Sequence, residues 1–336
     1  MRFDWAGRRV LVTGAAGFIG SALVWGLNGR GCSDVVAVDF AGSAEKKRNL
    51  EPLQFAEFVD AGSLGGRLES GSLGMFDCVF HLGACSSTTE LNEEYLRKNN
   101  FEYTRELARW AIARNVRFVY ASSAATYGDG SLGMDDGDLE RMKLLRPLNP
   151  YGNSKQMFDL FALQNGWLDR IVGLKYFNVF GPNEYHKGDM RSVVLKSFWQ
   201  ILDTGTIRLF KSYKPEYADG EQKRDFLYVK DAVEMTLFLA ESSAANGIFN
   251  IGSGQAHSWN ELAAAIFGAM DREPRIEYVD MPEAIRERYQ YFTKADIGKL
   301  RAAGYDSPLT SLEDAVQDYV MHYLVPDRGL RLTATG

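Results

Sequence analysis

A short apolar strand runs directly into a glycine-rich turn near the start of the chain. Val10–Thr13 is followed by the segment GAAGFIG at positions 14–20, and apolar residues then recur at helical spacing as far as Asn28. Glycines permit a tight turn and a close approach of the backbone, and the N-terminus of a helix offers unpaired N–H groups to an anion. A strand, a turn and a helix in this order therefore predict a phosphate-binding turn.

The same alternation of strand and helix continues along the first half of the chain. Apolar strands are expected at 34–38, 55–59, 78–82, 118–121 and 171–176, with the clearest helices at 93–114 and 150–165. This order is typical of a parallel sheet that helices cover on both faces. We predict an α/β fold with a doubly wound parallel sheet of about six or seven strands, to which a strand at 247–251 returns.

The regular alternation fades after Asn178. The charged tract 211–224 resembles a loop, and amphipathic helices recur at 192–202, 259–270 and 312–323, which predicts a smaller α/β lobe. We expect a dinucleotide-binding domain over 1–177, with return elements at about 225–252. The substrate-binding lobe then comprises 178–224 and 253–325, and residues 326–336 form a loose tail.

The composition argues against several classes of partner. Lys and Arg number 38 against 44 Asp and Glu, so the chain has no basic excess with which to bind nucleic acid. It begins without an apolar core of signal-peptide length and has no run of 18 apolar residues, so we expect a cytoplasmic protein without a membrane partner. Its three cysteines and four histidines never fall at a metal-ligand spacing, so no metal site is expected.

The second expected strand ends in an acidic residue. Asp39 follows Gly20 by about 20 residues, the position at which an acidic group commonly binds the adenosine ribose of a dinucleotide. Asp39 alone favours a free ribose 2′-hydroxyl and hence NAD. The basic run 46–48 is either a solvated charge cluster or a site for a 2′-phosphate, and with Lys46 in the second role we predict NADP, with NAD as the alternative.

A tyrosine and a lysine share one face of the helix expected after Pro150. Tyr151 and Lys155 are four residues apart, so the ammonium can lower the pKa of the phenol and make it a usable acid or base. An isolated pair of this kind would be an ordinary helix turn. Here the preceding strand ends in Ser122 and Ser123, which supply a hydroxyl.

These motifs together resemble the extended short-chain dehydrogenase/reductase superfamily, whose members have a Rossmann-type sheet. Other stretches are similar to the ADP-glycero-manno-heptose 6-epimerases in particular, and the similarity runs over nearly the whole chain. They are HLGACSSTT at 81–89, YASSAATYG at 120–128, YFNVFGP at 176–182, HKG at 186–188 and KRDF at 223–226. A dehydratase of the superfamily would carry Thr-Asp-Glu after the serine-bearing strand, but Ser123 is followed by two alanines, which disfavours dehydration.

The resemblance implies a role for each site residue. Tyr151 and Lys187 are the two acid/base groups, Lys155 binds the cofactor and tunes Tyr151, and Ser123 hydrogen-bonds the reacting hydroxyl. The expected cofactor contacts are Gly14, Gly17, Phe18, Ile19, Gly20, Asp39, Phe40, Lys46, Leu82, Ala84, Cys85, Ser86, Asn99, Lys155 and Val179. The expected substrate contacts are Asn178, Asp189, Lys196, Phe210, Arg224 and Tyr289. The family usually has Glu at position 82, Ser at position 189 and a shorter loop than 213–222.

The predicted activity is the interconversion of ADP-D-glycero-D-manno-heptose and ADP-L-glycero-D-manno-heptose by transient oxidation at C6″. The nucleotide sugar is the expected partner, and a homo-oligomer is expected although no residue pattern defines its size. One alternative is another nucleotide-sugar epimerase, such as a UDP-hexose 4-epimerase. Such an enzyme uses the same oxidation and reduction of the sugar and has a different substrate pocket. The other is a non-catalytic scaffold that binds the cofactor, against which the Ser123, Tyr151 and Lys155 set argues.

Overall fold

A seven-stranded parallel sheet forms the centre of the structure, a computed structural model that describes residues 4–40, 42–286 and 289–332. The strand order is β11-β6-β5-β4-β1-β2-β3, and every neighbouring pair is parallel. The strands are β1 (Val10–Thr13), β2 (Val35–Asp39), β3 (Glu57–Asp60), β4 (Cys78–His81), β5 (Arg117–Ser123), β6 (Val172–Tyr176) and β11 (Gly247–Ile251). The expected doubly wound α/β sheet is confirmed, and 247–251 returns to its edge as predicted.

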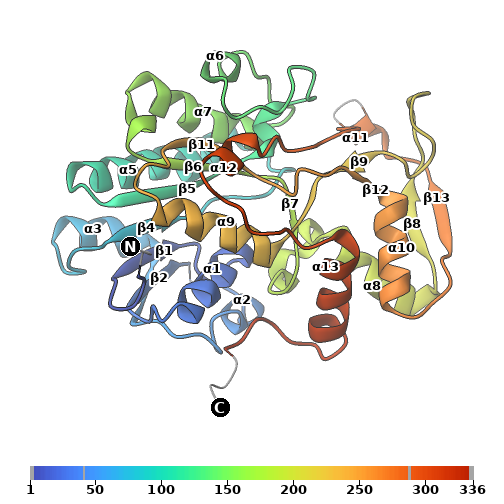
Figure 1. Ribbon diagram of the computed structural model, residues 1–336, viewed down its shortest axis with the longest axis horizontal. Helices are drawn as coiled ribbons and strands as arrows, with labels where there is room; N and C mark the ends of the chain where they lie inside the picture. Colours follow the sequence, from blue (N-terminus) through green and yellow to red (C-terminus); the bar gives the residue numbers. More distant parts are fainter. Residues whose placement is uncertain (1–3, 41, 287–288, 333–336) are drawn as a thin grey trace.

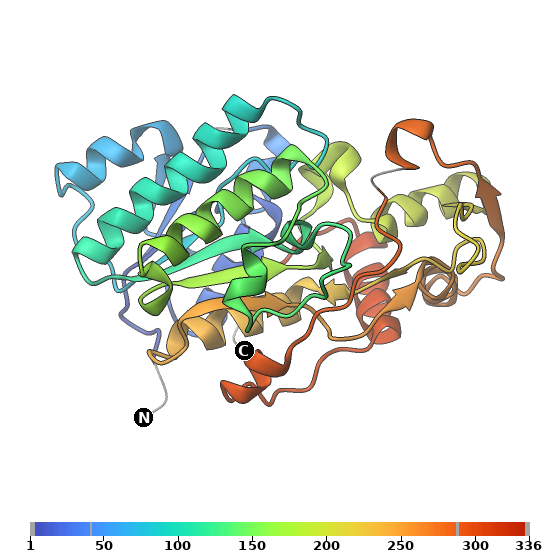
Figure 2. The same cartoon turned by 90° about the horizontal axis from the view of Figure 1, so that it is seen from above.

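Helices cover both faces of this sheet. Figure 2 shows α3, α5 and α7 side by side on one face of the sheet, and in Figure 1 α9 crosses in front of the sheet. Val10 and Val12 of β1 pack with the helices on one face, whereas Leu11 between them packs with the cluster on the other face. These helices are α1 (Phe18–Gly29), α2 (Ala44–Arg48), α3 (Leu64–Glu69), α4 (Glu93–Leu96), α5 (Tyr103–Ala113), α6 (Leu139–Met142), α7 (Pro150–Gln164) and α9 (Val229–Glu241).

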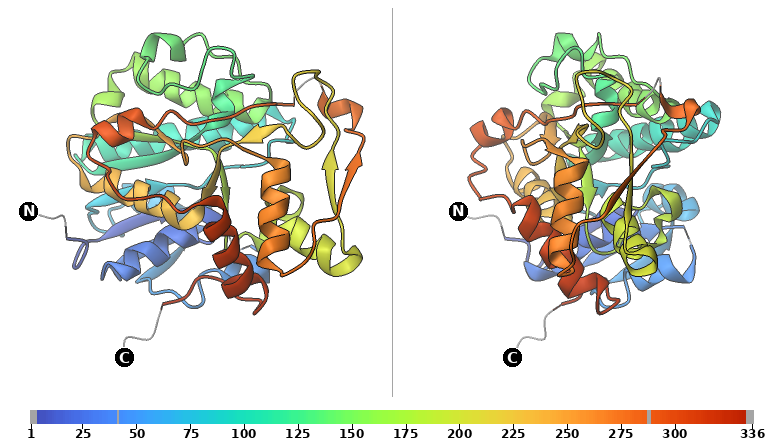
Figure 3. Two further views of the ribbon diagram at one scale, coloured as in Figure 1. Left: turned by 45° about the vertical axis from the view of Figure 1, so that its right-hand side comes forward. Right: turned by 90° about the vertical axis from the view of Figure 1, so that its right-hand side faces the viewer.

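A smaller lobe lies beside one end of the sheet, as the left view of Figure 3 shows. Three two-stranded sheets link its parts: β10 with β7, β12 with β9, and β13 with β8. The strands are β7 (Asn178–Phe180), β8 (Ile207–Phe210), β9 (Lys223–Arg224), β10 (Phe226–Tyr228), β12 (His257–Ser258) and β13 (Ile276–Val279). The helices after α7, apart from α9, are α8 (Val193–Thr204), α10 (Trp259–Ala269), α11 (Glu283–Arg286), α12 (Gly298–Ala302) and α13 (Leu312–Tyr319).

Tight or widened helical turns join several of these elements. Short 3₁₀ turns occupy Ala61–Ser63, Ala124–Tyr127, Trp167–Asp169 and Tyr185–Met190, and π turns occupy Arg97–Glu102 and Val320–Leu324. In the described part of the chain, the helices are too short or too polar to cross a membrane.

The C-terminal segment packs on the molecule instead of forming the loose tail that its lack of periodicity predicted. Leu330 is 1% exposed, and its amide donates to the Asn183 side chain over 2.8 Å. Arg48 of α2 donates to the carbonyl of Asp327 over 2.8 Å. One buried leucine with a few polar contacts produces no periodic pattern, so the sequence did not reveal this docking; residues 333–336 lie outside the described part.

The topology brings the ends of several strands together. The chain runs from β1 outward to β2 and β3, and then crosses to β4, β5 and β6 on the other side of β1. In such sheets a ligand binds at the carboxyl ends of the strands, where the order reverses. Thr13, Asp39, His81 and Ser123 end β1, β2, β4 and β5 at this edge.

Candidate active site

A cavity of about 1380 Å³ opens at the carboxyl edge of the sheet and extends to the lobe. It is lined by most of the predicted site residues, which come from both halves of the chain. They are Gly14, Gly17, Phe18, Ile19, Gly20, Asp39, Phe40, Lys46, Leu82, Ala84, Cys85, Ser86, Asn99, Ser123, Tyr151, Lys155, Asn178, Val179, Lys187, Arg224 and Tyr289. The fold therefore brings the predicted cofactor, proton-transfer and substrate residues to one cavity.

Three predicted substrate residues do not line this cavity. Lys196 of α8 donates to the carbonyl of Asp189 over 2.5 Å, so the two contact each other. Phe210 lies edge-on to Tyr289, with 6.4 Å between the ring centroids, and so packs against a residue that does line the cavity. The resemblance placed these residues at the substrate, but the structure places them outside the cavity wall.

The glycine-rich turn is closely packed. Gly14 has φ +69°, and a Cβ added there would lie 2.7 Å from the amide nitrogen of Gly83. A Cβ on Gly20 would lie 2.0 Å from the carbonyl oxygen of Gly14, so only glycine fits there. Gly17 caps α1 without a side-chain hydrogen bond, which leaves the first-turn N–H groups of α1 available to a diphosphate.

Asp39 is buried and its carboxylate is already engaged by the chain. Its Oδ2 accepts from the amide of Ala16 over 3.0 Å, and its Oδ1 accepts from the amide of Phe40 over 2.8 Å. Lys46 approaches the same Oδ1 with Nζ at 2.5 Å. The lysine expected to meet a 2′-phosphate is thus paired with the carboxylate expected to meet the ribose.

Tyr103 of α5 contributes a polar group that the sequence analysis did not identify. Its hydroxyl is buried and has no hydrogen-bond partner among the described residues, and its ring lies edge-on to His81 with 5.0 Å between centroids. Because Tyr103 lines the cavity, a ligand atom can satisfy this hydroxyl. The free N–H groups of α1 and the orphaned hydroxyl fit the polar groups of a dinucleotide, but no motif around Tyr103 indicates this role.

Ser123 and Tyr151 form the core of the proton-transfer group. Ser123 ends β5, and Tyr151 lies in the first turn of α7, which Asn149 caps by accepting the Gly152 amide over 2.7 Å. Burial raises the pKa of the Tyr151 phenol, and the hydrogen bond with Ser123 only partly opposes it. The net pKa is therefore raised, so burial outweighs the lowering of the phenol pKa that was expected from Lys155.

Lys155 lies on the same face of α7, one turn beyond Tyr151. Its Nζ donates to the carbonyl of Ala121 over 2.9 Å. Burial lowers the pKa of Lys155 to about 8, while the charge of Asp159 opposes this shift. Asp159 is itself fully buried and accepts from the Tyr120 hydroxyl over 2.9 Å and the Ser122 hydroxyl over 2.7 Å. The charge of the buried Asp159 carboxylate therefore favours the protonated form of Lys155.

Lys187 approaches the cavity from the 3₁₀ turn Tyr185–Met190. Its Nζ lies 5.2 Å from the centroid of the Phe18 ring, at the start of α1. Burial lowers the pKa of Lys187, and Glu184 opposes this effect. The neighbouring His186 has its pKa lowered to about 4, chiefly by burial, and so is neutral at pH 7.

Arg224 supplies a buried cation at the lobe side of the cavity. Its guanidinium carbon lies 5.6 Å from the ring centroid of Trp259 and 5.0 Å from that of Tyr289. The indole of Trp259 donates to the Tyr289 hydroxyl over 2.9 Å, which fixes the two rings. A guanidinium held between aromatic rings is well suited to a diphosphate. Trp259 was not predicted, because tryptophan in an amphipathic helix ordinarily indicates core.

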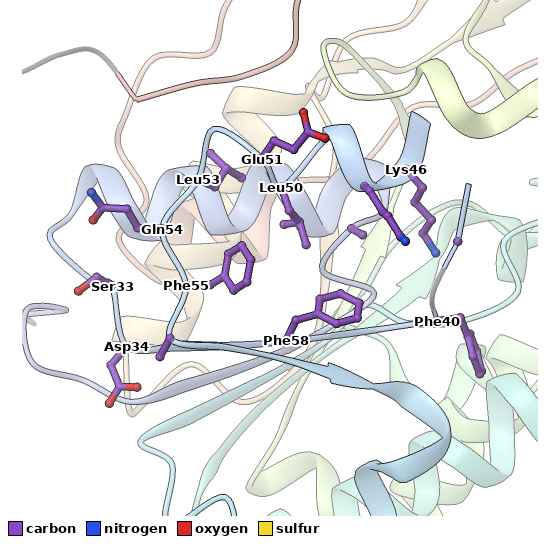
Figure 4. Close-up of a pocket in the computed structure, with 14 residues that line it drawn as sticks. Ser33, Asp34, Phe40, Lys46, Leu50, Glu51, Leu53, Gln54, Phe55 and Phe58 are labelled. Carbon is purple, nitrogen blue, oxygen red and sulfur yellow. The ribbon is translucent and has the colours of Figure 1, made fainter. Parts of the chain in front are cut away.

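A second cavity of about 940 Å³ lies between α2 and the edge strand β3 (Figure 4). Leu50, Phe55 and Phe58 give it an apolar wall, and it shares Phe40 and Lys46 with the first cavity. Apart from these two, no predicted site residue lines it within the described ranges. In the same ranges, no three His, Cys, Asp or Glu side chains are grouped so as to hold a metal ion.

Several known epimerases are similar to this chain in sequence or in structure. An ADP-L-glycero-D-manno-heptose-6-epimerase of Nitratidesulfovibrio vulgaris is 52% identical over 315 residues, which cover 94% of this chain and 97% of the relative. The solved ADP-L-glycero-D-manno-heptose-6-epimerase of Helicobacter pylori is 28% identical, with a TM-score of 0.78 over 95% of this chain and 97% of that one. A UDP-glucuronic acid 4-epimerase from Bacillus cereus, solved with UDP-glucuronic acid and NAD, is 26% identical with a TM-score of 0.75, over 94% and 99% of the two chains.

The model of the NAD dependent epimerase/dehydratase family matches residues 10–252, which include the glycine-rich turn and the tyrosine–lysine pair. Both the family match and the 52% identical relative span most of the chain. The chain therefore belongs to the NAD dependent epimerase/dehydratase family and, within it, to the ADP-L-glycero-D-manno-heptose-6-epimerases.

Proposed function

We infer that this chain is an NAD(P)-dependent epimerase that interconverts ADP-D-glycero-D-manno-heptose and ADP-L-glycero-D-manno-heptose at C6″. The observation that carries this inference is one cavity lined by the glycine-rich turn, by Ser123, Tyr151 and Lys155, and by Lys187. The 52% identical relative carries the name of this activity. The sheet portion 1–177 with 225–252 is assigned to the dinucleotide, and the lobe 178–224 with 253–325 to the sugar nucleotide.

The proposed mechanism assigns each proton to a side chain. When bound, the nicotinamide cofactor accepts and returns a hydride. Ser123 orients the C6″ hydroxyl, Tyr151 exchanges its proton on one face, and the Lys155 ammonium stabilises the phenolate form of Tyr151. Lys187 exchanges the proton on the other face.

The two acid/base groups match the geometry of the substrate. C6″ lies outside the pyranose ring, so rotation about the C5″–C6″ bond presents the second face of the ketone while the ring stays in place. Arg224, held between Trp259 and Tyr289, anchors the diphosphate during this rotation. Because the diphosphate and the ring stay fixed while C6″ turns, each of the two orientations of the C6″ oxygen needs its own proton-transfer group.

We propose NADP as the cofactor, with NAD as the alternative. The Asp39 carboxylate accepts from two backbone amides and is paired with Lys46, which reduces its repulsion of a 2′-phosphate. Lys46 is the member of the basic run that lines the large cavity, whereas Arg48 donates to the carbonyl of Asp327. Mass spectrometry of the small molecules released on denaturation tests this choice directly.

The activity is tested with purified protein and ADP-D-glycero-D-manno-heptose, and the C6″ epimer is detected by NMR. UDP-galactose in a parallel assay tests the alternative of a UDP-hexose 4-epimerase. Product from the ADP-heptose alone supports the proposal. Product from UDP-galactose alone would replace it, and binding of both cofactor and sugar without turnover would favour the scaffold alternative.

We also propose that the chain forms a homo-oligomer. Apolar side chains such as Met157 on α7 and Trp199 on α8 are 39% and 50% exposed, so association has apolar surface to bury. Sedimentation equilibrium decides the state, because an oligomer has a multiple of the 37.6 kDa chain mass.

A further inference from the structure

A buried carboxylate lies three residues before Lys187. Glu184 is 0% exposed, although it belongs to the loop that carries a proposed acid/base group to the cavity. Its Oε1 accepts from the Ser192 hydroxyl over 2.6 Å and from the Tyr319 hydroxyl over 3.1 Å. Its Oε2 accepts from the amide of Ser192 over 2.5 Å, and the amide of Gly181 donates to Oε1 over 3.4 Å. None of these contacts involves substrate or cofactor.

The donor set indicates that Glu184 carries a negative charge. A backbone N–H can only donate, and each carboxylate oxygen faces one of them, from Gly181 and from Ser192. The two hydroxyls can donate to the remaining lone pairs. Burial raises the pKa of Glu184, and the hydrogen bonds from Ser192 oppose that shift. A protonated carboxyl could donate only to the Ser192 or the Tyr319 hydroxyl, whereas the carboxylate accepts from both hydroxyls and both amides.

The same contacts close the loop on which Lys187 lies. Gly181 precedes the 3₁₀ turn and Ser192 follows it, so the Glu184 carboxylate joins the two ends of the segment. Within the turn, the amide of Lys187 donates to the carbonyl of Glu184 over 3.1 Å. Tyr319 of α13 holds the carboxylate from the opposite side. The position of Lys187 therefore depends on Glu184 through its backbone and its side chain.

Glu184 is also the acidic group that acts on Lys187. Burial and Lys196 both lower the pKa of Lys187, and Glu184 is the group that raises it. His186 is neutral at pH 7, since its pKa is lowered to about 4, and Tyr319 is a neutral donor because burial and the charge of Glu184 raise its pKa well above the ordinary range. Without Glu184, the charges facing Lys187 would be unfavourable to the ammonium.

We propose that Glu184 is the positioning residue for Lys187. Glu184 holds the loop that carries Lys187 in place, and its negative charge keeps the Lys187 ammonium protonated near neutral pH. This inference rests on the proposed role of Lys187 as the second acid/base group. It predicts that the charge of Glu184 matters in addition to its hydrogen bonds.

The test compares Glu184→Gln with Tyr319→Phe, which removes a hydrogen bond to the same carboxylate and keeps the charge. The readout is the pH dependence of acetylation of Lys187 by acetic anhydride, followed by mass spectrometry with the exposed Lys47 as internal reference. Only the neutral amine reacts. Loss of the charge in Glu184→Gln should move the midpoint for Lys187 to lower pH by about one unit, whereas Tyr319→Phe should leave it in place.

The corresponding kinetic readout is the pH profile of kcat/KM, in which the limb that reports Lys187 should move in the same direction in Glu184→Gln. If Glu184→Gln does not fold, Glu184→Asp replaces it. This variant keeps the charge, so the midpoint of Lys187 acetylation should stay near that of the wild type. Its shorter side chain cannot reach both Gly181 and Ser192, so kcat should fall. An unchanged midpoint in Glu184→Gln, or a drop of about one unit in Glu184→Asp, would overturn the proposal. Full activity of Lys187→Ala would instead refute the role of Lys187, with the labelling result for Glu184 still standing.

Discussion

The Nζ of Lys46 lies 2.5 Å from Oδ1 of Asp39, so the first residue of the basic run neutralises the acid at the end of β2. Asp39 is 4% exposed, and the pair stands at the edge of the large cavity. An unpaired carboxylate there would repel a phosphate on the ribose. The pairing makes the choice of cofactor depend on Lys46 as well as on Asp39.

Replacing Lys46 by Ala should therefore weaken NADP binding more than NAD binding. The change removes a cation and exposes the charge of Asp39, and a charge-assisted hydrogen bond contributes roughly 1.5–3 kcal/mol, or about 10- to 150-fold in affinity. Calorimetric titration of the cofactor-free protein measures both affinities, with Lys47→Ala as the neighbouring control. Equal losses for the two cofactors, or NAD as the molecule released from wild type, would show that Lys46 does not select NADP.

Tyr103→Phe should lower cofactor affinity and leave the fold intact. The hydroxyl has no partner among the described residues, so its removal costs no internal hydrogen bond. A hydrogen bond to ligand contributes about 0.5–1.5 kcal/mol, or roughly 3- to 10-fold in affinity. The measurement is the same titration together with thermal unfolding, and a loss of stability without a loss of affinity would contradict the assignment.

Tyr151→Phe and Lys187→Ala should each reduce epimerisation by a factor on the order of 10²–10⁴. Both variants remove a proton-transfer group and little buried surface, so folding and binding of the ADP-sugar should remain close to wild type. Single-turnover assays measure the chemical step, and circular dichroism controls for folding. If Lys187→Ala retained full activity, Tyr151 would have to serve both faces.

The activity should fall as pH rises through about 8, where Lys155 loses its proton. The sign follows from burial, which lowers the pKa of Lys155 so that the ammonium is present below that pH and lost above it. In Asp159→Asn the supporting negative charge is absent, so the fall should occur at lower pH. The pH profile of kcat tests this, with Glu51→Gln on the surface as control, and identical profiles for Asp159→Asn and wild type would contradict it.

Turnover in deuterium oxide should place no deuterium on C6″ of the heptose. C6″ has no adjacent carbonyl in the substrate, so its C–H bond is not acidic, and a hydride held on nicotinamide does not exchange with solvent. The protons handled by Tyr151 and Lys187 do exchange, so label should reach hydroxyls only. NMR of the product measures this: deuterium at C6″ would exclude direct return of hydride, and deuterium at C5″ or C7″ would show that the ketone enolises.

Local patterns in the sequence determined much of the fold and part of the site. The apolar run Val10–Thr13 and the strands after it predicted the parallel sheet, because a strand buried on both faces lacks polar alternation. The close approach of Gly20 to the Gly14 carbonyl follows from a turn that only glycine allows, and the four-residue spacing of Tyr151 and Lys155 places them on one helical face. Each of these features depends on neighbours a few residues away.

The remaining features depend on contacts between residues far apart in the chain, which no local spacing encodes. Tertiary packing left the Tyr103 hydroxyl without a hydrogen-bond partner among the described residues and raised the pKa of Tyr151 through burial. Asp189, Lys196 and Phe210, which the family resemblance implied as substrate contacts, do not line the cavity. Glu184 reads as an ordinary loop glutamate in the sequence. In the fold it is buried and accepts a hydrogen bond from Tyr319, 135 residues later in the chain. A buried carboxylate is stable only where the fold supplies donors to it, so the role of Glu184 follows from tertiary contacts and not from local sequence.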